Sequence, residues 1–178
     1  MDYILEDNPK KMGYIYKKYP RLKDKINVLY VPTFRKNQTN SMNEIYKKFD
    51  FDKYNLIIKY HPLDKTRMIR DSRISSKAVI VRDTNINIYD LYKVADVIIT
   101  DYSAASLEAC LLEKPVYFYL YDIDEYREDP GLNIDLFEEM PWCTSKSFDE
   151  IMAWIEEDEY DLDWIRGYKN TYFDIDLR

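Results

Sequence analysis

The sequence Asp-Val-Ile-Ile-Thr-Asp-Tyr-Ser at residues 96–103 places a short apolar strand directly before a polar turn. A helical pattern follows over residues 103–113, and Ser103 stands where the N-cap of that helix belongs. Other apolar runs on either side have the same form: residues 27–33 (NVLYVPT), 55–60 (NLIIKY), 78–82 (AVIVR) and 115–120 (PVYFYL). Short apolar strands that alternate with helices are typical of a parallel α/β sheet.

The remaining periodic segments complete this α/β pattern. Helices are predicted at residues 41–49, 88–94, 147–157 and 162–168, with Ser41/Glu44 and Ser147/Glu150 as capping boxes. Continuous apolar strands indicate burial on both faces of the sheet. We therefore predict a Rossmann-like, doubly wound parallel sheet over residues 27–178, preceded by a lead-in segment, residues 1–26, cut from something longer. Ligands bind outside the carboxyl ends of such strands, here at residues 33–35, 61–62 and 100–106.

Composition narrows the class of protein. The chain has 178 residues, enough for one domain, and only three glycines, which exclude a GxGxxG turn and a Walker-type loop. Residues 1–60 hold 13 basic and 7 acidic residues, whereas residues 101–178 hold 6 and 21. The acidic second half argues against nucleic acid as a partner. No apolar run approaches the ~20 residues of a membrane helix.

The turn after residues 96–100 is a candidate anion site. Unpaired N–H groups and the helix dipole at Ser103 favour a phosphate, and no glycine is needed. Ser106 and Glu108 lie within the next turn and a half, where Glu108 can accept hydrogen bonds from ribose hydroxyls. An ordinary capped helix with an exposed glutamate explains the same spacing, and both interpretations are open.

His61 is the only histidine, and it follows the strand at residues 55–60. Because Pro62 forces a turn, the imidazole is expected at the carboxyl edge of the sheet. As an imidazolium it can stabilise or protonate a departing phosphate. A single histidine is also commonly a structural residue, so placement decides between the two roles.

Two further patterns bear on the chemistry. Arg35 follows the strand at residues 27–33 and can contact a phosphate through its guanidinium fork, or it is a surface arginine. Three Asp-x-Asp pairs lie in the acidic second half, where such pairs arise by chance, and no His/Cys/Asp cluster has metal-ligand spacing. Cys110 and Cys143 are interpreted as reduced residues that form neither a disulfide nor a metal site. The sequence therefore indicates neither a metal nor another cofactor.

Taken together, four segments in register resemble the CDP-glycerol glycerophosphotransferase family, the teichoic-acid primases and polymerases. The resemblance covers residues 27–127 and rests on these stretches: 28–35 (VLYVPTFR, similar to LYAPTWR), 59–63 (KYHPL, similar to R-x-HPL), 90–103 (DLYKVADVIITDYS, similar to DLL…SDVLITDYSS) and 114–127 (KPVYFYLYDIDEYR, similar to KPIIFYAYDLEEYR). Two departures are Ala104, where the family has its second serine, and residues 128–135, which differ from the family's RGFYFDY.

The resemblance implies the C-terminal, nucleotide-binding domain of a GT-B fold. It implies an enzyme that transfers glycerol phosphate or a related polyol phosphate from a CDP-activated donor to a polymer or lipid-linked acceptor and releases CMP. His61 is then the catalytic residue. The expected donor-binding residues are Thr33, Arg35, Tyr60, Asp101, Ser103, Ala104, Ser106 and Glu108, where Glu108 stands in place of the aspartate of many members.

The resemblance also implies partners outside this chain. The acceptor and the membrane would be contacted through an N-terminal domain, so we expect the full-length protein to be cytoplasmic and peripheral on the inner face of the membrane. The isolated chain should bind nucleotide weakly and show no measurable turnover. Two alternatives remain: a GT-B glycosyltransferase or UDP-sugar epimerase domain that uses a nucleotide sugar, and a non-catalytic nucleotide-binding module.

Overall fold

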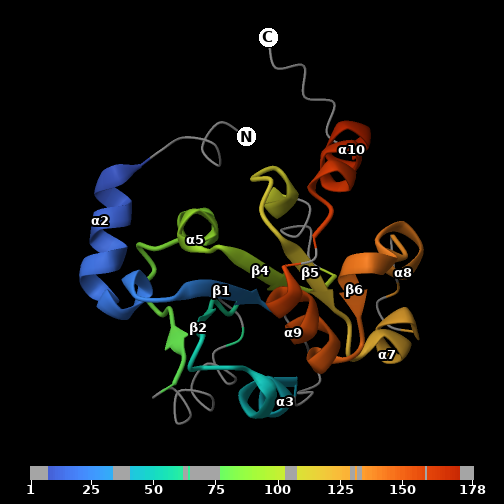
Figure 1. Cartoon of the computed structure of the whole chain (residues 1–178), viewed down its shortest axis with the longest axis horizontal. Helices are drawn as coiled ribbons and strands as arrows, with labels where there is room; N and C mark the ends of the chain where they lie inside the picture. The colour runs from blue at the N-terminus through green and yellow to red at the C-terminus, as the bar shows by residue number, and fades with distance from the viewer. Residues whose placement is uncertain are drawn as a thin grey trace.

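A parallel sheet and the helices around it make up the described part of the chain (Figure 1). The computed structural model describes residues 8–33, 41–61, 64, 77–102, 108–128, 131, 134–158 and 160–172. Its elements in chain order are α2 (Pro9–Lys18), η1 (Pro20–Lys23), β1 (Ile26–Val31), α3 (Ser41–Lys48), β2 (Tyr54–Ile58), β3 (Val79–Ile80), α5 (Ile88–Val94), β4 (Val97–Thr100), β5 (Val116–Tyr119), α7 (Ile123–Glu128), α8 (Leu136–Glu139), η2 (Pro141–Cys143), β6 (Thr144–Ser145), α9 (Phe148–Glu157) and α10 (Leu162–Tyr172).

The strand order confirms the predicted doubly wound sheet. Within the described residues, six strands lie in the order β3-β2-β1-β4-β5-β6, and every neighbouring pair is parallel. From β1 the chain proceeds outward to β3, and it then crosses back to β4 and proceeds outward to β6. The order therefore reverses between β1 and β4. In such sheets this reversal opens a crevice at the carboxyl ends of the two strands, which is the usual ligand site.

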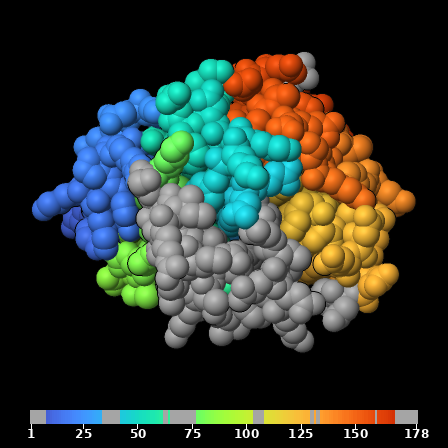
Figure 2. Space-filling model, turned by 90° about the horizontal axis from the view of Figure 1, so that it is seen from below, coloured from blue at the N-terminus to red at the C-terminus, as the bar shows by residue number. Residues whose placement is uncertain are grey.

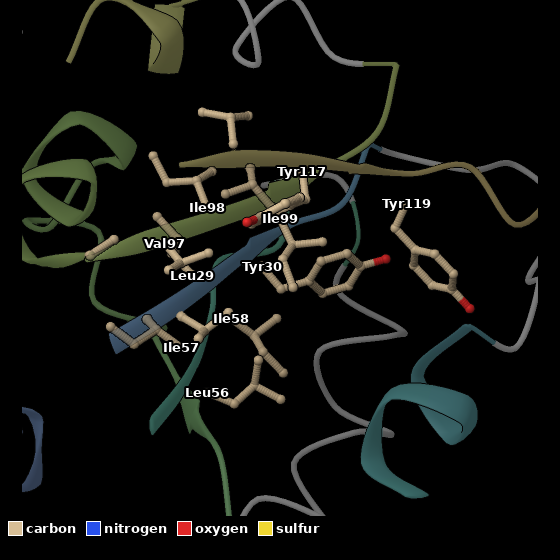
Figure 3. Close-up of a cluster of buried hydrophobic side chains, with 14 of the residues drawn as sticks. Leu29, Tyr30, Leu56, Ile57, Ile58, Val97, Ile98, Ile99, Tyr117 and Tyr119 are labelled. Atoms are coloured by element: carbon tan, nitrogen blue, oxygen red, sulfur yellow. The ribbon is translucent and has the colours of Figure 1, made fainter. Parts of the chain in front are cut away.

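Helices cover both faces of the sheet, and the strands between them are buried. Figure 1 shows α2 and α5 on one side of the sheet and α3 on the other. Helices α3 and α9 lie side by side in Figures 1 and 2, joined by an ion pair of 2.6 Å between Lys48 Nζ and Asp149 Oδ2. Figure 3 shows apolar side chains of β1, β2, β4 and β5 packed together. Burial on both faces explains why these strands lack alternation of polar and apolar residues.

A polar network closes the amino edge of the sheet. The buried Asn27 side chain donates to the carbonyl oxygens of Leu22 (2.9 Å) and Val94 (3.2 Å), and Asn55 Nδ2 donates to Asn27 Oδ1 at 3.0 Å. Asp96 Oδ2 accepts the backbone N–H of Asn27 at 2.7 Å. These hydrogen bonds satisfy the buried polar groups and hold the starts of the strands together, so the polar residues at this edge have a structural role.

Several local predictions differ from the structure. The two-residue strand β6 was not predicted, because two residues carry no periodic signal. The predicted capping box of Ser147 with Glu150 is wrong: the Ser147 side chain makes no capping bond, and Ser145 Oγ bonds both Glu150 Oε2 and the Ser147 N–H. Glu44 accepts from Tyr119 and Lys48, while the predicted cap by the Ser41 side chain lies outside the described residues.

The segment predicted as a lead-in is folded onto the domain where it is described. Ile15 of α2 and Leu22 of η1 are 0% and 2% exposed and belong to the same core as the strands. Asn8 caps α2, and its Oδ1 accepts the Lys11 N–H at 3.0 Å. A boundary at residue 26 stays a prediction, but α2 and η1 pack with the sheet that follows it.

Candidate functional site

Three of the candidate residues, Thr33, His61 and Asp101, lie at the carboxyl edge of the sheet. Strands β1, β2 and β4 are neighbours and run parallel, so their carboxyl ends share one edge. Thr33 follows β1, His61 follows β2, and Asp101 follows β4. This is the arrangement that the sequence predicted for these strand ends. It also places Thr33 and Asp101 on the two sides of the point where the strand order reverses.

Thr33 and Asp101 are joined directly across this reversal point. The backbone N–H of Thr33 donates to both carboxylate oxygens of Asp101, at 3.0 Å to Oδ1 and 2.9 Å to Oδ2. The Thr33 hydroxyl also donates to Oδ1. Asp101 is 1% exposed, whereas Thr33 is half-buried. Three hydrogen bonds to one carboxylate therefore tie the end of β1 to the end of β4.

His61 is exposed on a turn that is held from two sides. Before it, the Lys59 N–H donates to Tyr30 O at 3.2 Å, and Lys59 Nζ donates to Ile86 O (2.8 Å) and Asp83 O (3.2 Å). After it, Asp64 N donates to His61 O at 2.8 Å. Burial lowers the pKa of the Lys59 ammonium. The turn thus presents the imidazole at the carboxyl edge as predicted, while its catalytic role stays a prediction.

Tyr60 and Glu108 lie in different surroundings from His61. Tyr60 is 6% exposed and belongs to the core, so packing is its evident role, and a ligand contact stays a prediction. Glu108 is half-buried at the start of the helical residues 108–110. Burial, and after it a hydrogen bond to Glu108, raises the pKa of Tyr89. Tyr89, in the first turn of α5, is thus a neighbour of Glu108 that the sequence did not point to.

A second unpredicted contact fixes the start of the loop after β4. The rings of Tyr102 and Tyr126 stack with centroids 3.8 Å apart and an interplanar angle of 11°. Tyr126 belongs to α7, which follows β5. Asp101 is bonded toward β1 and Tyr102 is stacked on α7, so residues 101–102 are anchored on both sides. The sequence did not predict this pair, because a high number of tyrosines does not indicate which of them stack on one another.

Some predicted residues lie outside the described residues: Arg35, Ser103, Ala104 and Ser106. Among the residues that are described, no cluster of His, Cys, Asp and Glu has a geometry that could hold a metal ion. Cys110 and Cys143 are both buried and form no disulfide with each other, and burial raises the pKa of Cys110 to about 12. Within the same part of the chain, no helix has the length and hydrophobicity to cross a membrane.

Comparison with known proteins gives a consistent result along the chain. The model of the family CDP-Glycerol:Poly(glycerophosphate) glycerophosphotransferase matches residues 1–176. A teichoic acid poly(ribitol-phosphate) polymerase of Bacillus spizizenii is 32% identical over 171 residues, which cover 90% of this chain and 27% of that protein. A teichoic acid glycerol-phosphate primase of the same organism is 30% identical over 155 residues, covering 78% of this chain and 39% of that protein. The chain thus spans well under half the length of these relatives.

Solved structures give the same fold. The wall teichoic acid polymerase TagF superimposes with a TM-score of 0.74 at 20% identity, covering 95% of this chain and 44% of that one. A TagF variant soaked with CDPG superimposes with a TM-score of 0.67, covering 94% of this chain and 42% of that one. At these identities the likeness shows the fold, a Rossmann-like parallel sheet with helices on both faces.

Proposed function

This chain belongs to the CDP-glycerol:poly(glycerophosphate) glycerophosphotransferase family, and we propose that it is the nucleotide-donor-binding domain of such a transferase. The donor is CDP-glycerol or a related CDP-polyol. An acceptor hydroxyl attacks the phosphorus of the polyol phosphate, the bond from that phosphorus to the CMP oxygen breaks, and CMP leaves. One observation carries the proposal: Thr33, His61 and Asp101 follow three neighbouring parallel strands, at the edge and reversal point where such sheets bind ligands.

The proposed roles follow from where each group lies. His61 is exposed after the end of β2, one strand away from the reversal point, and as an imidazolium it stabilises or protonates the CMP phosphate as it departs. The helix that the sequence predicts from Ser103 would offer its first N–H groups to the diphosphate, together with Ala104 and Ser106, and Arg35 would offer its guanidinium. Glu108 accepts from ribose hydroxyls, and Tyr89 holds its carboxylate.

The acceptor belongs to another part of the full-length protein in this proposal. The relatives are far longer than this chain, which covers 27% and 39% of the two described above. Without the opposite wall of the cleft, the isolated chain binds donor weakly and turns over nothing measurable. Positioning of two reactants can supply roughly 7–11 kcal/mol of a barrier, and one wall alone loses most of it. Contact with the inner face of the membrane is likewise assigned to the full-length protein.

A ligand titration followed by NMR tests the proposal on the 178-residue chain. CMP, CDP-glycerol and CDP-ribitol are titrated beside UMP and UDP-glucose, and backbone amide shifts are followed. The expected result is saturable binding of the cytidine ligands, with the largest shifts at Thr33, His61 and Asp101. The amides of Asn27 and Asn55, at the opposite edge, serve as the internal control and should stay in place. Preference for uridine ligands, or shifts centred on the amino edge, would refute the proposal.

A further inference from the structure

The Asp101 carboxylate is directed to Thr33. It is 1% exposed and accepts three hydrogen bonds from that residue, two from the backbone N–H and one from the hydroxyl. Accepting both the N–H, shared between its two oxygens, and the O–H of Thr33 suits an ionised carboxylate, which has only acceptor positions. A carboxylate that touched a diphosphate would repel it, because like charges at contact distance raise the energy of the bound state. Direct contact with the phosphates is therefore a poor role for Asp101.

We propose that Asp101 is a positioning residue for the donor, acting through Thr33 and touching no part of the ligand itself. The inference rests on the proposed donor-binding function. It gives the Asp101–Thr33 pair a chemical task in addition to holding β1 and β4 together. Residues 68 positions apart in the chain meet here, at the point where the strand order reverses.

The task follows from the hydrogen-bonding capacity of a hydroxyl. Threonine has one O–H donor and two acceptor lone pairs. Since the Thr33 O–H is donated to Asp101, the hydroxyl offers only lone pairs to a ligand. Thr33 therefore accepts a hydrogen bond from a hydroxyl of the donor and does not donate one to its phosphates. The recognised group is an alcohol, either on the ribose or on the polyol.

Asparagine at position 101 would reverse this polarity. A carboxamide keeps one acceptor oxygen and adds two N–H donors. In the orientation that places its NH2 group beside the Thr33 hydroxyl, an N–H occupies a lone pair of that hydroxyl, and the hydroxyl hydrogen turns toward the ligand. Valine at position 33 keeps the shape of the side chain and the backbone N–H but removes the hydroxyl. Serine keeps the hydroxyl, so Thr33→Ser is the matched control.

A double-mutant cycle on the 178-residue chain tests the inference. Dissociation constants for CDP-glycerol and CMP are measured by NMR titration for the unmutated chain, Asp101→Asn, Thr33→Val and the double variant, with urea unfolding of each protein. Each single change should weaken CDP-glycerol binding about 3–10-fold, the worth of one neutral hydrogen bond, and Thr33→Ser less than about twofold. Asp101→Asn should add less than about twofold in the Thr33→Val background, because its effect passes through the hydroxyl.

The outcomes separate the possible roles. If Thr33→Val weakens CMP and CDP-glycerol alike, the recognised alcohol is on the ribose, and if it weakens only CDP-glycerol, it is on the polyol; either result supports the inference. Fold-changes that multiply in the double variant would show direct contact by Asp101 and overturn it. Lower unfolding stability with unchanged dissociation constants would also overturn it, leaving an architectural role. No binding of either ligand by the unmutated chain would instead overturn the proposed function, and this inference with it.

Discussion

The C-terminus of α5 depends on a lysine from a different part of the chain. Lys114 Nζ donates to Ala95 O (2.6 Å), Tyr92 O (2.9 Å) and Lys93 O (3.2 Å). Carbonyls at a helix end have no partner within the helix, so the ammonium satisfies three groups at once. Lys114→Met keeps the apolar stem and removes the donor. A typical hydrogen bond contributes about 0.5–1.5 kcal/mol net, so the variant should lose about 1.5–4 kcal/mol of unfolding free energy.

Urea unfolding followed by circular dichroism measures this loss. For a chain of this size the predicted loss corresponds to a fall in Tm of about 3–16 °C. The matched control is Lys146→Met, because Lys146 is 50% exposed and pairs at 2.8 Å with an Asp124 side chain that is 80% exposed. Such a surface pair contributes about 0–1 kcal/mol. If Lys114→Met were no less stable than Lys146→Met, the α5 carbonyls would be satisfied by water, and the reasoning would be refuted.

Three other changes have distinct expected results. In an enzyme that also carries its acceptor-binding part, His61→Ala should lower kcat by about 10²–10⁴-fold with little change in donor affinity. A lowered Tm with a normal kcat would show that His61 only stabilises the turn. Hydrogen bonds, first from Lys18 and then from Tyr14, hold the pKa of Asp83 well below its ordinary 3.8. This stabilisation of α2 is present above pH 3.8 and is lost as the pH falls toward the folded pKa. The protection factors of the α2 amides, which are their exchange rates relative to the intrinsic rate at each pH, should therefore fall in acid. The same fall in Asp83→Asn would contradict the assignment. Tyr126→Leu should lower the free energy of unfolding by about 0.5–1.5 kcal/mol more than the lost burial accounts for, and it should weaken donor binding. Tyr126→Phe keeps the stack on Tyr102, so equal effects of the two substitutions would argue against stacking.

The fold was predictable because its signals are local. Five apolar runs without alternation indicated strands buried on both faces, and β1, β2, β3, β4 and β5 form at those runs. The Asn87 side chain and Asp90 form a capping box at the start of α5, and α5 spans the predicted residues 88–94. Strand β6 was not predicted, because it is two residues long and can be recognised only from its pairing with β5 in the folded chain. The Ser147 cap failed because Ser145, two residues earlier, supplies the hydroxyl.

The sequence alone determined which residues end the strands, and hence that Thr33, His61 and Asp101 would share one edge of a parallel sheet. Short-range patterns of apolar and turn residues indicate where each strand ends, and the alternation of strands with helices indicates that the strands are parallel. Only the tertiary structure decided what these side chains do to one another. Asp101 became a buried partner of Thr33, Tyr102 stacked on Tyr126, and Lys114 capped α5. Each contact joins segments far apart in sequence, and its geometry is fixed by strand order and packing, which no local pattern encodes.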